Sequence, residues 1–158
     1  MNNHSIKAQL KLNHRDAFMW ARHCCGHDHE DAREVVQIAY LKIMEGRARY
    51  HGKSTFKTWL FSVIRFSAID YMKKKPITLP VDQLVMQAFE PSNGSHVNYE
   101  ELLGRLSDRQ RQVLLLAFYH DLTLVEISEV TDLSIGTVRT YYERGKRALK
   151  NLILKQTV

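Results

Sequence analysis

The segment between Thr123 and Leu149 constrains the fold more than any other part of the chain. Thr123 and Glu126 have the T-x-x-E spacing of a capping box, which predicts the start of a helix. A turn at Asp132 follows, and Ser134 can cap a second helix. The segment is therefore predicted to form a helix-turn-helix, whose inward residues are Ile127, Val130, Val138, Tyr142 and Leu149.

The outward face of the second predicted helix carries polar and basic side chains. Side chains near the start of such a helix can reach base edges in a major groove, and arginine can reach phosphate or guanine. The pattern favours duplex DNA binding, while an ordinary helical hairpin with a solvated basic face is the alternative that it leaves open. The candidate DNA contacts are Thr137, Arg139, Thr140, Tyr141, Arg144 and Arg147.

Composition is consistent with a globular protein that has a polyanionic partner. The chain has 158 residues, of which 44% are hydrophobic and 25% are charged, with a formal net charge of +6. No apolar run reaches the length of about 18 residues that a membrane span needs, and the N-terminus lacks the apolar core of a signal peptide. The adjacent Cys24 and Cys25 give no disulfide framework. We therefore expect a cytoplasmic protein.

The rest of the chain also shows helical periodicity and no useful strand-like alternation, so the predicted fold class is all-α. Two small helical domains joined by a linker are expected. Residues 1–75 should form an N-terminal three- to four-helix bundle, with helices over 5–25, 29–45 and 55–74 and a basic loop from Gly46 to Ser54. Residues 76–97 hold all three prolines and are interpreted as the linker, with a short helix near 82–89. Residues 98–158 should form the helix-turn-helix domain, in which Ser107 and Gln110 form a second capping box.

Two separated stretches resemble conserved regions of one protein family. The segments DAREVVQIAYLKIMEG and TFKTWLFSVIRFSAIDYMKKK resemble region 2 of bacterial sigma factors. The segment LSDRQRQVLLLAFYHDLTLVEISEVTDLSIGTVRTYYERGKRAL resembles their region 4. Their order and the short linker are similar to the small extracytoplasmic-function (ECF) type, and the resemblance extends from about Ala17 to Leu152.

The resemblance implies a promoter-specificity subunit of RNA polymerase. It implies that the helix matching Asp31–Tyr40 docks on the clamp helices of the largest subunit of the core enzyme, and that the C-terminal domain reads the minus-35 element and packs on the flap of the second-largest subunit. An anti-sigma factor is a further partner that the family suggests. The residues expected to bind core polymerase are Asp31, Glu34, Val35, Gln37, Ile38 and Leu41.

The resemblance also implies that the loop and helix matching Gly46–Arg65 open and read the minus-10 element. Opening DNA costs unstacking and unpairing energy, which a protein recovers by stacking on bases, at roughly 1–3 kcal/mol per base, and by neutralising phosphates. Trp59 is expected mainly to pack beside the DNA surface, whereas Tyr50 and the loop cations are expected to make contact. The candidates are Arg47, Tyr50, Lys53, Phe56, Lys57, Trp59, Arg65 and Phe66.

The sequence departs from the family pattern at several positions. Arg33 and Ile38 stand where acidic residues are usual, and like charge at an interface is costly, so weaker binding to core polymerase is one hypothesis and a shifted contact is the other. Phe66 stands where the family often has the asparagine of a base pocket, and Tyr141 stands where an arginine is usual. The promoter sequence therefore does not follow from the family.

A histidine- and cysteine-rich stretch follows the first predicted helix. His23, Cys24 and His27 are the candidates for a metal or redox site, but adjacent cysteines lack the separated-pair spacing of a closed zinc site. No cofactor is expected, and no catalytic motif is evident, so an enzyme is not expected. The alternatives to a sigma factor are a helix-turn-helix regulator that binds duplex DNA independently of core polymerase and a protein-interaction module without specific DNA contact.

Overall fold

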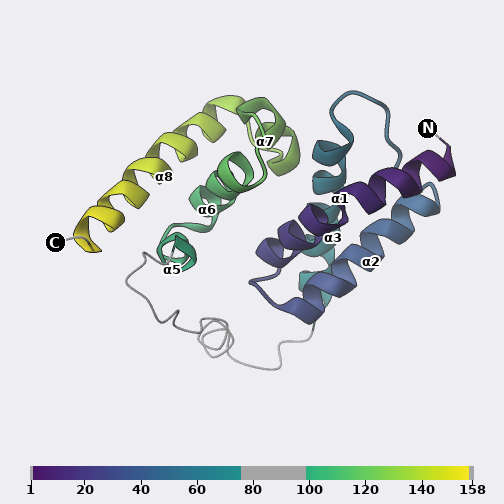
Figure 1. Cartoon of the computed structure of the whole chain (residues 1–158), viewed down its shortest axis with the longest axis horizontal. Helices are drawn as coiled ribbons and strands as arrows, with labels where there is room; N and C mark the ends of the chain where they lie inside the picture. Colours follow the sequence, from purple (N-terminus) through teal and green to yellow (C-terminus); the bar gives the residue numbers. More distant parts are fainter. Residues whose placement is uncertain (1, 76–98, 157–158) are drawn as a thin grey trace. The chain divides into compact units, whose positions relative to one another are not determined.

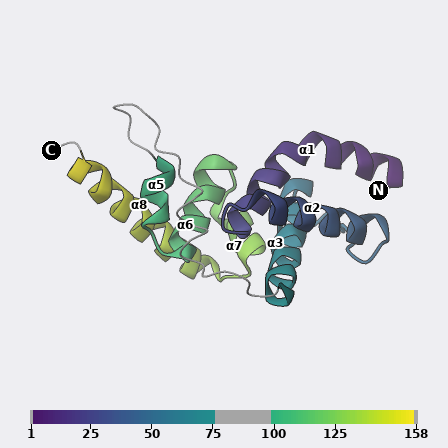
Figure 2. The same cartoon turned by 90° about the horizontal axis from the view of Figure 1, so that it is seen from below.

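The computed structural model describes residues 2–75 and 99–156, and every regular element in these residues is helical (Figures 1 and 2). They divide into two compact units. The N-terminal unit consists of α1 (Asn3–Cys24), α2 (His29–Met44) and α3 (Phe56–Lys74). The C-terminal unit consists of α5 (Tyr99–Gly104), α6 (Asp108–Leu114), the π-helix η1 (Leu115–Tyr119), most of α7 (Leu124–Thr131) and α8 (Ile135–Gln156). The all-α prediction is confirmed, while the expected helix near 82–89 lies outside the described residues.

Polar side chains at the helix starts explain where the three N-terminal helices begin. The side chains of Asn2, Asp28 and Thr55 accept hydrogen bonds from the backbone N–H groups of Ser5, Asp31 and Thr58, respectively. Each bond satisfies one of the N–H groups that have no partner within the helix. The observed helices differ from the predicted ranges by one or two residues, and α1 starts earlier than predicted because Asn2 caps it.

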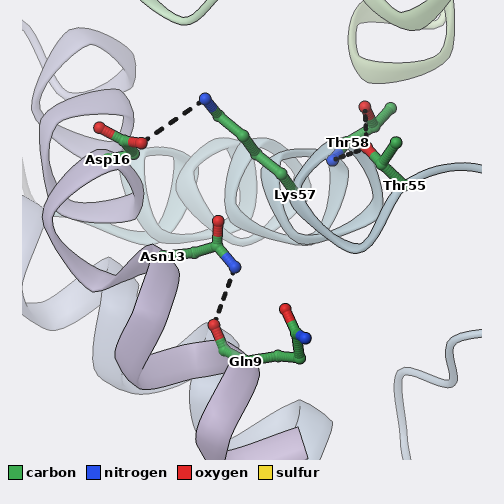
Figure 3. Close-up of polar contacts among 6 residues, drawn as sticks. All are labelled: Gln9, Asn13, Asp16, Thr55, Lys57 and Thr58. Carbon is green, nitrogen blue, oxygen red and sulfur yellow. Dashed lines mark hydrogen bonds and ion pairs between the residues drawn. The ribbon is translucent and has the colours of Figure 1, made fainter.

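The core of the N-terminal unit is centred on Trp20 of α1 and Phe61 of α3, whose side chains are fully buried. The Trp20 indole Nε1–H donates to the Phe61 carbonyl oxygen at 3.1 Å, and the two rings stack with centroids 5.7 Å apart. At one edge of this interface, Lys57 of α3 lies 3.5 Å from the Asp16 carboxylate of α1 (Figure 3). Along the same side of α1, the Asn13 amide donates to the Gln9 carbonyl oxygen at 2.8 Å (Figure 3). Helices α1 and α3 are thus joined by both apolar and polar contacts.

In the C-terminal unit, α6 packs against α8 at a close approach. Gly145 of α8 is buried, and a β-carbon placed there would lie 3.1 Å from Cδ1 of Leu114. After Leu114 the chain does not continue as ordinary α-helix but forms the π-helix η1. A single π-helical turn leaves no distinct spacing in the sequence, and so the hydrophobic pattern did not reveal it. Among the apolar residues here, Val113 and Leu116 are fully buried, whereas Ala117 is partly exposed.

Candidate nucleic-acid and polymerase interfaces

The helix-turn-helix is formed by α7, the turn after it and α8. Both bonds of the capping box are present: the Thr123 N–H donates to Glu126 Oε1 at 2.9 Å, and the Glu126 N–H donates to Thr123 Oγ1 at 3.1 Å. Asp132 turns the chain in the left-handed conformation, with φ of 60°. The Thr137 N–H donates to Ser134 Oγ at 3.2 Å, which caps α8. The helix-turn-helix predicted from the sequence is therefore confirmed. At the second predicted capping box, the structure shows one of the two bonds, from the Gln110 N–H to the Ser107 hydroxyl.

The inward side of α8 matches the prediction in part. Val138 is fully buried, whereas Tyr142 and Leu149 are only partly so. The Tyr142 ring stacks on the exposed Phe118 at 5.7 Å, and Lys146 Nζ lies 4.3 Å from the centre of the Tyr142 ring. Tyr142 therefore packs at the rim of the core.

The outward side of α8 carries polar and basic side chains, together with the exposed Glu143. Thr137, Tyr141 and Arg144 are spaced at i, i+4 and i+7, so they share one face of the helix. Thr140 donates from Oγ1 to the Gly136 carbonyl oxygen at 3.0 Å, and its side chain is exposed. Arg139, Thr140, Arg144 and Arg147 are exposed, and Thr137 and Tyr141 are partly exposed.

The loop between α2 and α3 is held by a group of three aromatic side chains. The Tyr50 hydroxyl donates to the Ser54 carbonyl oxygen. Its ring lies 5.5 Å from that of Phe56 and 5.4 Å from that of Trp59, and the last two rings are 5.4 Å apart. Tyr50 thus anchors the loop, and its ring packs against the other two while staying partly exposed, so its expected DNA contact stays a prediction. Phe56 is 8% exposed and packs in the core, which leaves little of its ring for stacking on a base.

The candidate cations beside this group differ in their surroundings. Arg47 and Lys53 are exposed, although Arg47 lies 2.8 Å from the exposed Glu45 carboxylate. Exposed ion pairs of this kind contribute little free energy, so Arg47 remains available to a phosphate. Lys57 pairs with Asp16 and is mostly covered. Lys57 of α3 is therefore less accessible to DNA than the loop cations Arg47 and Lys53.

Phe66 is the most exposed aromatic side chain of α3, with 52% of its surface accessible, and the Arg65 guanidinium lies 6.0 Å from its ring centre. Its neighbour Ser67, in contrast, is buried and accepts a hydrogen bond from Lys42 Nζ at 3.2 Å. Phe66, which departs from the family pattern, therefore changes the surface of α3, whereas Ser67 contributes to the contact between α2 and α3.

The predicted polymerase contacts on α2 fall into two groups that differ in solvent exposure. Glu34, Gln37 and Leu41 are exposed and Ile38 is partly so, and their spacing places them in one stripe. Val35 has no exposed surface, because it packs in the core with the rest of the inward face of α2. Asp31 is only 5% exposed. Burial therefore leaves Val35 and Asp31 little surface for a direct contact, so the predicted polymerase contacts of these two residues stay predictions.

The histidine and cysteine side chains after α1 are close together without converging. The rings of His23 and His27 lie 5.5 Å apart at a steep angle. Within residues 2–75 and 99–156, no group of three or more His, Cys, Asp or Glu side chains is placed to hold a metal ion. Burial raises the pKa of the Cys25 thiol to about 12, and burial likewise raises the pKa of Cys24. Both thiols are protonated at neutral pH, whereas metal binding and nucleophilic reactivity require thiolate.

Comparison with known proteins relates these surfaces to one family. The family model described as Sigma-70 region 2 matches residues 10–76, and the one described as Sigma-70, region 4 matches residues 96–149. RNA polymerase sigma factor SigV of Bacillus subtilis is 25% identical over 130 residues, which cover 80% of this chain and 78% of SigV. The ECF sigma-E factor of Escherichia coli is 26% identical over 141 residues, covering 78% and 74% of the two chains.

Two solved structures share the fold. Sigma factor RpoE of Bartonella quintana, in complex with the anti-sigma factor NepR, has a TM-score of 0.73 at 20% identity over 94% of this chain and 96% of that one. CnrH in complex with the cytosolic domain of CnrY has a TM-score of 0.66 at 20% identity over 96% and 90%. No helix among the described residues is both long and apolar enough to cross a bilayer. With both conserved regions present in family order, this chain belongs to the sigma-70 family as an ECF sigma factor, which directs RNA polymerase in transcription initiation.

Proposed function

We propose that the two units divide promoter recognition between them. Residues 1–75 bind core polymerase and open the minus-10 element, residues 98–158 read the minus-35 element, and residues 76–97 connect the two activities. This division is supported by a difference between the two basic surfaces. The surface on α8 belongs to a capped helix-turn-helix, whereas the surface on the loop and α3 combines cations with an exposed aromatic ring. A helix-turn-helix suits an intact major groove, whereas cations beside an exposed ring outside such a motif suit unpaired bases.

In the minus-35 complex, the first turns of α8 lie in the major groove. The partly exposed Thr137 and Tyr141 approach base edges, while Arg144 and Arg147 neutralise phosphates farther along the helix. Arg139 and Thr140 complete the contact surface. Because Tyr141 replaces a cation of the family pattern, part of this contact is aromatic, and the preferred minus-35 sequence differs accordingly.

In the minus-10 complex, the nontemplate strand passes over the loop and the exposed side of α3. Arg47 and Lys53 contribute charge from the loop, and Arg65 contributes it from α3. Phe66 offers a ring on which an unpaired base stacks, since 52% of its surface is accessible. Tyr50 and Trp59 support this surface from below by fixing the loop against α3.

Core polymerase binds the stripe formed by Glu34, Gln37, Ile38 and Leu41 on α2, which docks on the clamp helices of the largest subunit, while the C-terminal unit packs on the flap of the second-largest subunit. Arg33 is exposed beside this stripe and carries like charge toward a basic clamp, which weakens docking. An anti-sigma factor is a further partner, since the similar sigma factor RpoE was solved in complex with one. The protein acts in the cytoplasm, where the polymerase is, and it acts as a DNA-binding regulator without catalysing a reaction of its own.

Transcription from genomic DNA by purified core polymerase, with and without the chain, tests the proposal. Mapped start sites that appear only with the chain, and that share two spaced elements upstream, are the expected result. Arg139→Ala should reduce transcription from these starts, whereas Lys155→Ala, which removes the same charge from the far end of α8, should leave it nearly unchanged. Duplex binding by the chain without any polymerase-dependent transcription would instead establish the helix-turn-helix regulator.

Polymerase docking can be measured without DNA. Leu41→Ala should weaken the affinity for core polymerase, and Leu12→Ala is the matched control, because both leucines are exposed but only Leu41 lies on the proposed stripe. Arg33→Glu should strengthen binding if like charge opposes docking. Equal effects of the two leucine variants would place the polymerase contact elsewhere.

A further inference from the structure

The first turn of α2 carries a carboxylate that faces the protein interior. Asp31 is the third residue of α2, and its backbone N–H donates to Asp28 Oδ1 at 2.9 Å, which completes the helix cap. Its side chain is 7% exposed, although Glu30 before it and Arg33 after it are exposed. An isolated carboxylate in such a position would be costly, so its partners decide what it does.

Both oxygens of this carboxylate are bound by the end of α3. The Tyr71 hydroxyl donates to Oδ1 at 3.0 Å, and Lys75 Nζ donates to Oδ2 at 2.6 Å. Lys75 follows the last residue of α3, and its backbone N–H donates to the Tyr71 carbonyl oxygen at 3.1 Å. The hydrogen bond from Tyr71 to Asp31 also raises the pKa of the Tyr71 phenol to about 12. The three side chains therefore form one polar cluster that fastens the start of α2 to the end of α3.

The cluster lies one helical turn before the stripe that docks on polymerase. Glu34 is at i+3 from Asp31, and Gln37, Ile38 and Leu41 continue along the helix from there. Because a helix is rigid over a few turns, fixing its first turn fixes the direction in which these four side chains project. Loss of an interaction at Asp31 therefore changes the orientation of the stripe, although Asp31 itself does not contact the partner.

We propose that Asp31 is a positioning residue, which acts through Lys75 and Tyr71 to hold the docking stripe of α2 in the orientation that core polymerase binds. The proposal rests on the polymerase-binding function argued above. It has a consequence that a direct contact lacks: Lys75, which belongs to the end of α3 and not to the stripe, contributes to polymerase affinity through the same carboxylate.

A double-mutant cycle on the full chain tests the proposal, with affinity for purified core polymerase as the measurement. Asp31→Asn and Lys75→Met should each weaken binding by about tenfold, because each breaks a charge-assisted hydrogen bond that sets the orientation of α2. The double variant should bind no more weakly than Asp31→Asn alone, since both changes remove the same interaction. Lys75→Arg, which keeps charge and donor, should restore most of the affinity.

Two controls separate orientation from charge and from general stability. Lys74→Met removes an exposed neighbouring charge and should leave affinity unchanged. Ile64→Val destabilises the buried interior of the same unit without touching the cluster and should also leave affinity unchanged at temperatures where the unit is folded. As an independent readout, near-ultraviolet titration should show the pKa of Tyr71 returning toward its ordinary value in Asp31→Asn, with Tyr71→Phe identifying the signal.

Unchanged affinity in Lys75→Met, or effects of the two substitutions that multiply in the double variant, would overturn the proposal and return Asp31 to the status of a direct contact. The Lys75 variant decides the matter even if Asp31→Asn does not fold, because the Lys75 side chain is one-third exposed and tolerates replacement. Failure of the unmodified chain to bind core polymerase would instead refute the proposed function, which keeps the two failures distinct.

Discussion

Helix α8 contains two glycines in opposite surroundings, and the same substitution should therefore change stability in opposite directions. Gly136 lies in the first turn, and a β-carbon there would meet nothing within 4 Å. Gly145 lies in the interior of the helix, where a β-carbon would approach Cδ1 and Cγ of Leu114 at 3.1 and 3.2 Å. Leu114 is 2% exposed and cannot turn away into solvent.

The expected magnitudes follow from two opposing effects. Replacing glycine by alanine in a helix gains up to about 1 kcal/mol, because alanine loses less conformational entropy. Gly136→Ala realises this gain without a steric cost. At Gly145 the α6–α8 contact must open by a few tenths of an ångström, and overpacking of this kind costs about 1–3 kcal/mol. Gly145→Ala should therefore destabilise the C-terminal unit by about 1 kcal/mol, which corresponds to about 4–8 °C in the melting temperature of a unit this small.

Thermal unfolding followed by circular dichroism measures both variants, and tryptophan fluorescence provides an internal reference. Both tryptophans of the chain, Trp20 and Trp59, lie in the N-terminal unit, so the fluorescence transition should be the same in the two variants and the parent. The circular-dichroism transition of the C-terminal unit should rise in Gly136→Ala and fall in Gly145→Ala. Equal stabilisation by both substitutions would show that α6 and α8 are not in tight contact, and the packing argument would fail.

Three further predictions concern the core, the polar cluster and the helix-turn-helix. Trp20→Phe should destabilise the N-terminal unit by about 2 kcal/mol in chemical denaturation, because the bond to the Phe61 carbonyl and part of the packed volume are lost; no change would contradict the buried stack. The hydrogen bond to Asp31 raises the pKa of Tyr71 from 10.0 to about 12, so its stabilising contribution is complete below pH 10.0 and is lost as the pH rises toward 12. Alkaline unfolding should therefore be shallower in Tyr71→Phe than in the parent, and parallel curves would refute the assignment. Thr123→Ala should lower the stability of the C-terminal unit by about 1 kcal/mol in calorimetry, and Thr123→Ser should restore it.

Features encoded by a few consecutive residues were predictable. The capping box at Thr123 and the cap at Ser134 were read from the sequence because each needs only partners three residues away. The start of α2 was predicted for the same reason, since Asp28 stands directly before it. Local signals of this kind do not distinguish a π-helical turn from ordinary helix, and η1 was therefore missed.

The sequence predicted which residues belong to the candidate site, but it predicted only in part which of their side chains are exposed to solvent. On a helical wheel, Asp31 lies at the edge of the docking stripe and looks like one more surface acid. It is buried because Tyr71 and Lys75, 40 and 44 residues away in sequence, cover it. Tyr50 was predicted as a DNA contact, and the sequence alone did not show that its ring packs against Phe56 and Trp59.

The amino-acid sequence by itself determined the helices, their caps, the helix-turn-helix and the family, because periodicity, capping and motif order are properties of neighbouring residues along the chain. The tertiary structure alone decided which polar and aromatic side chains remain available to a partner. The physical reason is that solvent exposure and hydrogen-bond partners depend on which distant segments pack together, and the burial of one carboxylate or one ring has no signature in the residues beside it.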